Sequence, residues 1–154
     1  MARKVESPTV VITGLEAADR PLWTKLWRGY LAFYETTLPD SQYDFTWSRL
    51  LNGEAINGLA ARSNGEIIGI DHYLFHPSAW TVAPVCYLQD LFVDPASRGS
   101  GAGRALIKAV ASRAHAAGSS RLYWMTQEGN VTARLLYDRL AKAPGFIRYD
   151  LALT

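Results

Sequence analysis

The sequence predicts a mixed α/β domain with a mostly antiparallel sheet of about six to seven strands, flanked by about four helices. Two observations carry this prediction. The hydrophobic period changes from helical to alternating in the middle of the chain and later returns to helical. Turn-forming residues separate three consecutive strand-like segments in that middle region, which is typical of a meander. Because 154 residues is the usual size of one domain, we expect residues 1–154 to form a single domain.

The N-terminal third predicts one strand and two helices. A β-branched run at residues 10–12 indicates the strand, and Pro21 lies where the first turn of a helix is expected. Apolar and aromatic residues then recur at helical spacing until the helix ends before Pro39. Asp40 can cap a second helix, and Gly53 marks its end.

The middle of the chain predicts three strands, at residues 59–62, 67–75 and 85–93. Turn chemistry at residues 63–66 and 77–80 separates them. The three strands are therefore expected to pair as an antiparallel meander.

The remainder of the chain alternates helices with strands. A helix follows the meander and stops before Gly118, and a strand is expected at residues 121–126. A further helix is expected from residue 130 to about residue 142, and the alternation at residues 147–153 predicts a last strand. Parallel strand pairing is expected around the crossover helix that follows the meander.

Charge and hydropathy exclude several classes of function. The net charge is +2, and the sixteen basic residues are interspersed with fourteen acidic ones, so the composition does not support nucleic-acid binding. No apolar run is long enough to span a bilayer, so no membrane partner is expected. The first eight residues lack the apolar core of a signal peptide.

The cysteine and histidine residues predict neither a disulfide framework nor a metal site. Cys86 is the only cysteine, which suits a reducing compartment and predicts a cytoplasmic location. His72, His76 and His115 lack the mutual spacing of metal ligands. We therefore expect no metal and no catalytic cysteine.

A glycine-rich loop joins the third meander strand to the following helix. Backbone N–H groups can converge in such a loop, and the start of the helix adds the positive end of its dipole, so the loop suits an anion such as pyrophosphate. A plain flexible turn before a helix is the alternative reading. The loop consists of Arg98, Gly99, Ser100, Gly101, Ala102, Gly103 and Arg104.

Two familiar phosphate motifs do not fit this loop. A Walker loop ends in Gly-Lys-Ser/Thr, whereas Gly103 is followed by Arg104 and Ala105, which disfavours ATP or GTP hydrolysis. A dinucleotide fingerprint requires a different glycine spacing and an acidic residue at the end of the next strand, and residues 125–127 provide none. A nicotinamide cofactor is therefore disfavoured as well.

The loop resembles the acetyl-CoA signature of the GNAT superfamily of N-acetyltransferases. Arg98, Gly101 and Gly103 match its Arg-x-x-Gly-x-Gly pattern between a strand and a helix. A second family motif is similar to residues 130–137, which read Asn-x-x-Ala-x-x-Leu-Tyr, followed by Gly-Phe at 145–146. The two motifs cover roughly the C-terminal half, and the order of the other elements is also similar. The sequence is most like the small-amine, polyamine and histone-tail branch.

The resemblance implies an acetyl-CoA site with a strand splayed from its neighbour, so that the pantetheine arm runs between residues 88–93 and 123–126. The implied cofactor contacts are Leu91, Phe92, Val93, the loop from Arg98 to Arg104, Asn130, Ala133 and Tyr137. Family members have a tyrosine at the position of Tyr137, which donates a proton to the departing thiolate.

The second motif also makes physical sense on a helix. Asn130, Ala133 and Tyr137 are three and four residues apart, so they form one stripe along the helix. A thiolate that leaves is helped by a nearby acid, which the Tyr137 phenol can supply. The alternatives are that Asn130 is only an N-cap and that Tyr137 is a core aromatic.

The attacking amine must be neutral, so a base or water relay is expected near a strand bulge before the loop. Gln89 and Asp90 lie there. In the polyamine acetyltransferases that this strand resembles, the corresponding pair is Glu-Asp. Gln89 cannot act as a base and is assigned to acceptor binding, which leaves Asp90 as the candidate base, with a solvated or acceptor-binding carboxylate as the alternative.

The region around the first two helices predicts a cationic acceptor. Aromatic rings and carboxylates together suit a primary amine that carries positive charge, such as a diamine, a polyamine or a lysine side chain. The alternative is that most of these rings, with Trp23 and Trp27, only pack against the sheet. The assigned acceptor residues are Tyr30, Tyr34, Glu35, Asp44 and Gln89, with Asp40, Tyr43 and Trp47 nearby.

Three functions follow from these observations, in order. The first is an acetyl-CoA-dependent N-acetyltransferase that acts by direct attack of the amine, with Tyr137 as general acid. The second is a non-catalytic domain that binds or senses acyl-CoA. The third is a general module for phosphate ligands. The resemblance also allows a homodimer, and the sequence does not identify the acceptor.

Overall fold

The structure is a computed structural model that describes residues 8–153. These residues form two compact units. The larger one ends at Trp124 and holds the sheet, and the smaller one begins at Met125 and holds the last helix. The expectation of a single domain over residues 1–154 stays a prediction. Most of the N-terminal segment that lacks a signal-peptide core lies outside the described residues.

The larger unit is built on a five-stranded sheet in the order β1-β2-β3-β4-β5. The first four strands pair antiparallel with their neighbours, and β5 pairs parallel with β4. The predicted meander and the parallel pairing around the crossover are thus confirmed. The strands are β1 (Val10–Gly14), β2 (Asn57–Ser63), β3 (Glu66–His76), β4 (Val85–Val93) and β5 (Leu122–Tyr123).

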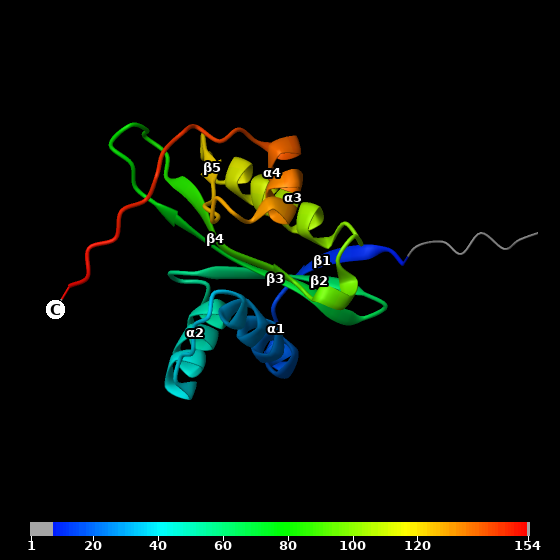
Figure 1. Cartoon of the computed structure of the whole chain (residues 1–154). Helices are drawn as coiled ribbons and strands as arrows, with labels where there is room; N and C mark the ends of the chain where they lie inside the picture. Colours follow the sequence, from blue (N-terminus) through cyan, green and yellow to red (C-terminus); the bar gives the residue numbers. More distant parts are fainter. Residues whose placement is uncertain (1–7, 154) are drawn as a thin grey trace, which may run out of the picture. The chain divides into compact units, whose positions relative to one another are not determined.

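Helices cover both faces of this sheet. In Figure 1, α1 and α2 lie on one face and α3 lies on the other. The predicted stop signals are confirmed, because Gly53 and Gly118 both adopt left-handed backbone angles just after helices. The helices of the larger unit are α1 (Arg20–Phe33), α2 (Asp40–Asn52) and α3 (Ala102–Ala116), with short 3-10 turns η1 (Ala17–Asp19) and η2 (Pro95–Ser97).

An aromatic core lies between the first two helices and the sheet. Trp23 is fully buried, and its ring centroid lies 5.0 Å from that of Trp47 and 6.3 Å from that of Trp27. The reading of Trp23 and Trp27 as packing residues is therefore confirmed. The cluster consists of Trp23, Leu26, Trp27, Leu31, Tyr43, Trp47, Leu50, Ala60, Ile67 and Ile70.

The smaller unit differs from the prediction at its C-terminal end. Helix α4 (Val131–Leu140) forms as expected, but no strand follows it within the described residues. Ile147, Tyr149 and Leu151 alternate as a strand would, yet they are 75%, 87% and 85% exposed. Alternation produces a half-buried strand only where a neighbouring strand pairs with it. The sheet therefore has five strands instead of six to seven, and the strand predicted at residues 121–126 is limited to β5.

The structure also bears on the membrane and metal predictions. Every helix in residues 8–153 is too short or too polar to cross a membrane. Within the same residues, no group of three His, Cys, Asp or Glu side chains lies close enough together to hold a metal ion.

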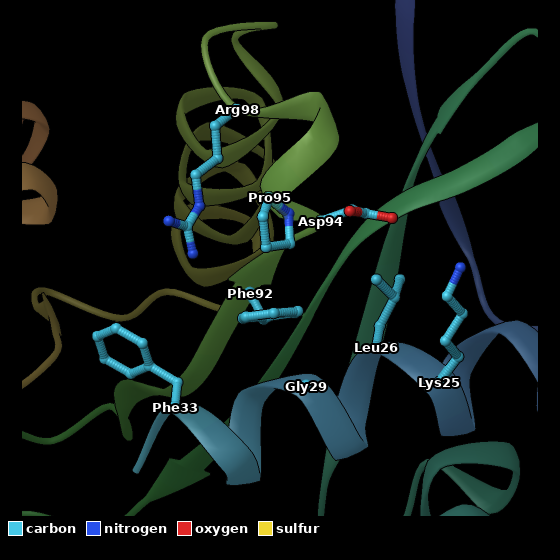
Figure 2. A pocket seen from close by; sticks show the side chains of 8 residues that line it. All are labelled: Lys25, Leu26, Gly29, Phe33, Phe92, Asp94, Pro95 and Arg98. Atoms are coloured by element: carbon cyan, nitrogen blue, oxygen red, sulfur yellow. The ribbon is translucent and has the colours of Figure 1, made fainter.

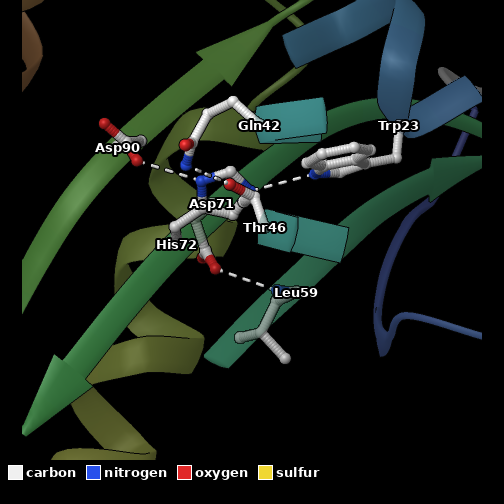
Figure 3. A network of polar contacts seen from close by, with 7 residues as sticks. All are labelled: Trp23, Gln42, Thr46, Leu59, Asp71, His72 and Asp90. Carbon is white, nitrogen blue, oxygen red and sulfur yellow. Dashed lines mark hydrogen bonds and ion pairs between the residues drawn. The ribbon is translucent and has the colours of Figure 1, made fainter. Parts of the chain in front are cut away.

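A buried carboxylate in β3 makes the stability of the fold depend on pH. Asp71 is fully buried, its Oδ1 accepts a hydrogen bond of 3.0 Å from the N–H of Leu59, and its Oδ2 has no hydrogen-bond partner (Figure 3). Burial raises the pKa of Asp71 well above its ordinary value, against smaller opposing effects of the Leu59 N–H and Arg113. The protonated form is thus favoured in the folded state.

We expect Asp71→Asn to stabilise the protein at neutral pH. A group whose pKa is raised on folding contributes stability below its unfolded pKa of about 4, and this contribution is lost as the pH rises towards its folded pKa. The neutral amide avoids that loss, so the variant should gain about 1 kcal/mol or more near pH 8 and almost nothing near pH 4. Urea unfolding at both pH values measures the difference, and a gain that does not change with pH would contradict this reading.

Candidate active site

The glycine-rich loop begins where β4 leaves the sheet. The N–H of Asp94 donates to the carbonyl oxygen of Ile68 at 2.8 Å, which ties the segment that leads into the loop to the start of β3. The Oδ1 of Asp94 accepts a hydrogen bond of 3.0 Å from the N–H of Ala96 and so caps η2. The loop is therefore anchored at its entry. Gly99 and Gly101 lie between this anchor and α3, whereas Gly103 lies in the first turn of α3.

Two glycines of this loop have left-handed backbone angles. Gly99 has a φ of +81° and Gly101 has a φ of +85°, and Gly101 is the N-cap of α3. The first turn of α3 holds no acidic residue, and Arg104 lies exposed within it. Because the first N–H groups of a helix have no partner inside the helix, the turn presents donors and positive dipole to an anion. The arrangement fits the pyrophosphate that the sequence predicts here.

We expect Gly101→Val to weaken acetyl-CoA binding about tenfold or more, because a β-branched residue strains a backbone with positive φ and would move the loop. Isothermal titration measures the affinity. Gly65→Val is the matched control, because Gly65 has a φ of +81° and an added Cβ at either glycine meets nothing within 4 Å. Equal affinity in Gly101→Val and Gly65→Val would refute the assignment of this loop.

One edge of β4 lacks a strand partner next to the loop. β5 pairs only with Cys86 and Tyr87 of β4, so within the described residues the ladder stops there, although β4 continues to Val93. Leu91, Phe92 and Val93 lie in this unpaired part and are half-buried. The resemblance assigns the pantetheine arm to this edge, and the early end of β5 leaves backbone groups there for it.

A pocket of about 250 Å³ lies between α1 and the end of β4 (Figure 2). Gly29 lets the helix approach this strand, because a Cβ at Gly29 would lie 2.9 Å from the Phe92 ring. The charged groups of the pocket are Lys25 on α1, Asp94 just after β4 and Arg98 at the start of the glycine-rich loop. It is lined by Lys25, Leu26, Gly29, Phe33, Phe92, Asp94, Pro95 and Arg98.

Asp90 belongs to a chain of polar side chains that crosses β3 and β4 (Figure 3). Its Oδ2 lies 2.9 Å from Nδ1 of His72, and the indole N–H of Trp23 donates to Nε2 of His72 at 3.0 Å. His72 is 2% exposed and the side chain of Asp90 is 14% exposed. The carboxylate is thus held by His72 on its buried side, and its other side is accessible to solvent.

The predicted bulge lies beside this carboxylate. His72 pairs with Asp90 and Tyr73 pairs with Leu88, so Gln89 is the extra residue in the ladder. The side chain of Gln89 is exposed. The bulge therefore places Gln89 and Asp90 where the strand departs from regular alternation, just before the loop.

Tyr30 on α1 lies in a cluster of aromatic rings. The ring centroid of Tyr30 lies 5.0 Å from those of Trp27 and Tyr34 and 6.4 Å from that of Phe92. Burial raises the pKa of Tyr30 above its ordinary value, and the nearby Asp90 carboxylate raises it further. The phenol thus stays protonated. The structure brings Tyr30 to Asp90, and Tyr34 packs against Tyr30.

The other residues assigned to the acceptor lie in less enclosed positions. Glu35 is exposed and has a left-handed φ of +53° just after α1. Asp44 forms an ion pair with Arg20, and its side chain is 65% exposed. Its charge is therefore already partnered.

The second motif lies in the smaller unit. Asn130 is the N-cap residue of α4, and its Nδ2 donates to Oγ1 of Thr126 at 3.1 Å. Ala133 and Tyr137 are half-buried, whereas Val131 is exposed. The stripe predicted from the spacing therefore exists on α4.

Sequence reasoning missed two participants in the site. His72 was considered only as a metal ligand, and Trp23 only as a core residue, yet the two form the hydrogen-bonded chain to Asp90. The signal that could have found His72 is a titratable residue in an otherwise apolar strand that neighbours the strand of Asp90. Cys86, by contrast, is buried, and burial raises the pKa of its thiol to about 11, so it is no nucleophile at neutral pH.

Comparisons with known proteins agree with this geometry. Residues 20–141 match the model of the acetyltransferase (GNAT) family, and the chain belongs to this family. It is an acyl-CoA-dependent N-acetyltransferase, the enzyme class that the two motifs predict.

Two relatives and one solved structure show how close the similarity is. The chain is 36% identical to the D-amino-acid N-acetyltransferase of Saccharomyces cerevisiae, over 90% of this chain and 88% of the relative. It is 29% identical to the thialysine N-epsilon-acetyltransferase of Caenorhabditis elegans, over 66% of each. The crystal structure of a ribosomal-protein-alanine N-acetyltransferase from Brucella melitensis has 25% identity and a TM-score of 0.79, covering 94% of this chain and 99% of that one. The predicted fold class is confirmed.

Proposed function

We propose that the protein transfers the acetyl group of acetyl-CoA to a cationic primary amine by direct attack, with Asp90 as the base and Tyr137 as the acid. Acetyl-CoA supplies the acetyl group as a thioester. Asp90 takes a proton from the ammonium form of the acceptor, and the neutral nitrogen then bonds to the acetyl carbon. Tyr137 gives a proton to the sulfur as the carbon–sulfur bond breaks, and the proton that the nitrogen loses as the amide forms restores the phenol. The observation that carries the proposal is the partly exposed Asp90 carboxylate beside the phenol of Tyr30, on the strand that leads to the glycine-rich loop.

The residues of the chain fit acetyl-CoA. The loop from Arg98 to Arg104 would hold the pyrophosphate with backbone N–H groups, and the unpaired edge of β4 would hold the pantetheine arm. Asn130 and Ala133 are proposed contacts from α4. The acetyl-CoA signature of the family supports this assignment.

The acceptor is proposed to be a small diamine, a polyamine or a lysine-like molecule. Aromatic faces attract a cation, and the Asp90 carboxylate adds a negative charge beside them. Tyr30, Tyr34, Glu35, Asp44 and Gln89 remain the proposed acceptor contacts. The names of the two relatives, which act on D-amino acids and on thialysine, support a small-molecule amine as the acceptor.

A panel of matched amines tests the acceptor. A linear diamine and a linear monoamine of the same carbon number differ only in the charge at the far end. At equal concentrations of free base, we expect the diamine to have at least about a tenfold higher kcat/KM, since a cation–π contact in a desolvated site is worth about 2 kcal/mol. Thiol release measures the rate, and D-lysine, L-lysine and a polyamine complete the panel. Equal kcat/KM for the diamine and the monoamine would overturn the cationic acceptor.

We also propose a cytoplasmic location, because a lone cysteine suits a reducing compartment. We further propose that the protein forms a homodimer. The exposed apolar side chains of Phe146, Ile147 and Leu153 support the homodimer, because a second copy could cover them.

A further inference from the structure

We infer that His72 is a positioning residue that holds the Asp90 carboxylate in its reactive orientation, with Trp23 fixing the tautomer of the imidazole. This inference rests on the proposed role of Asp90 as the base. It assigns a part in the reaction to a histidine that belongs to neither family motif.

The hydrogen bonds define which ring nitrogen of His72 carries the proton. An indole N–H can only donate, so Nε2 of His72, 3.0 Å from Nε1 of Trp23, must accept and therefore has no proton. The neutral ring then carries its proton on Nδ1, which donates to Oδ2 of Asp90 at 2.9 Å. A single neutral tautomer satisfies both contacts. An imidazolium would carry a proton on Nε2 as well, and this N–H would face the indole N–H of Trp23.

The same bonds show that His72 does not pass a proton onward. A relay would need an acceptor beyond Nε2, but the chain ends there in the N–H of Trp23, which is fully buried. The proton that Asp90 takes from the amine therefore leaves by another route. The contribution of His72 is to orient a carboxylate that itself touches the acceptor.

The bulge explains why Asp90 needs such a support. The extra residue, Gln89, interrupts the ladder directly before Asp90, so the regular alternation of side chains is broken at this point of β4. His72 is the cross-strand partner of Asp90 in β3 and is itself held by the core. The hydrogen bond from the His72 ring holds the direction of the Asp90 side chain at this irregular point of the strand.

Groups from α1 and α2 also lie around Asp90 and His72. From α1, the phenol of Tyr30 faces the carboxylate, and Tyr34 and Tyr87 lie next to Tyr30. From α2, Gln42 and Thr46 hydrogen-bond to each other at 3.3 Å. Tyr30 also interacts with the Asp90 carboxylate through its phenol. The ring of His72 is held at both nitrogens, by Asp90 at Nδ1 and by the indole N–H of Trp23 at Nε2.

Two amide variants separate the two contacts of the ring. The amide of His72→Asn reaches about as far as Nδ1, so it keeps a donor for Asp90 and loses the acceptor for Trp23. The longer amide of His72→Gln reaches about as far as Nε2, so it keeps the acceptor for Trp23 and loses the donor for Asp90. We expect kcat with acetyl-CoA and a linear diamine to fall about tenfold or more in His72→Gln and much less in His72→Asn. The KM for acetyl-CoA should stay unchanged in both variants.

A mutant cycle with Asp90→Asn completes the test. If His72 acts through Asp90, the double variant Asp90→Asn/His72→Gln should be no slower than Asp90→Asn alone, because the two side chains act as a unit. Parental kcat in His72→Gln, a lower kcat in His72→Asn than in His72→Gln, or additive losses in the double variant would overturn the positioning role and leave the proposed function intact. Parental kcat in Asp90→Asn would instead overturn the proposed base and this inference with it. Urea unfolding confirms that each variant is folded.

Discussion

Tyr137→Phe is expected to lower kcat about a hundredfold while leaving the affinity for acetyl-CoA nearly unchanged. The change deletes one proton donor and keeps the ring. The parent enzyme should lose activity at alkaline pH, where the phenol loses its proton and can no longer protonate the sulfur. This alkaline limb should vanish from the pH profile of the variant. Steady-state rates across pH and a titration with acetyl-CoA measure both effects.

Tyr149→Phe is the matched control for this experiment. Tyr149 lies in the same unit, is 87% exposed and undergoes the same loss of a hydroxyl group. Its rate and pH profile should equal those of the parent. An unchanged rate and an unchanged alkaline limb in Tyr137→Phe would reduce Tyr137 to a packing residue and would favour the non-catalytic domain.

Asp90→Asn is expected to lower kcat/KM by about a hundredfold or more at neutral pH, because the amide cannot take the proton of the attacking amine. The carbonyl oxygen of the new side chain still accepts a hydrogen bond from His72, so the fold should be kept. The loss should shrink as the pH approaches the pKa of a primary amine, about 10, because the acceptor is then already neutral in solution. Rates at several pH values with a diamine measure this recovery.

Glu66→Gln provides the control for Asp90→Asn. Glu66 is an exposed carboxylate on β3, the strand that neighbours β4, and it lies at the start of that strand. Its loss should leave kcat/KM unchanged at every pH. A loss in Asp90→Asn that stays constant up to alkaline pH would show that Asp90 binds the acceptor and does not remove its proton.

The parts of the fold that depend on local sequence could be predicted. The bounds of β4 agree with the predicted strand, and the stops of α2 and α3 lie at glycines that need left-handed angles. The alternation at residues 147–153 misled the prediction, because alternation reports the two faces of a segment and does not show whether a neighbouring strand exists. Pairing of this kind depends on distant residues.

In the candidate site, too, the features that depend on local sequence could be predicted and those that depend on distant residues could not. The loop with Gly99 and Gly101 could be predicted because its chemistry lies in consecutive residues. The contact between His72 and Asp90 could not, because the two residues are 18 positions apart and meet only through the register that the bulge at Gln89 sets. Cross-strand partners follow from register, which single-sequence patterns do not fix when a bulge is present.

The most direct measurement is the balance of products from acetyl-CoA and a linear diamine. An N-acetyltransferase with this site should release free CoA thiol and form acetylated amine in equal amounts, and both should depend on the diamine. Mass spectrometry of the amine together with thiol titration gives the two quantities in one sample. Binding of acetyl-CoA without thiol release with any amine in the panel, or thiol release that does not require an amine, would contradict the proposed function.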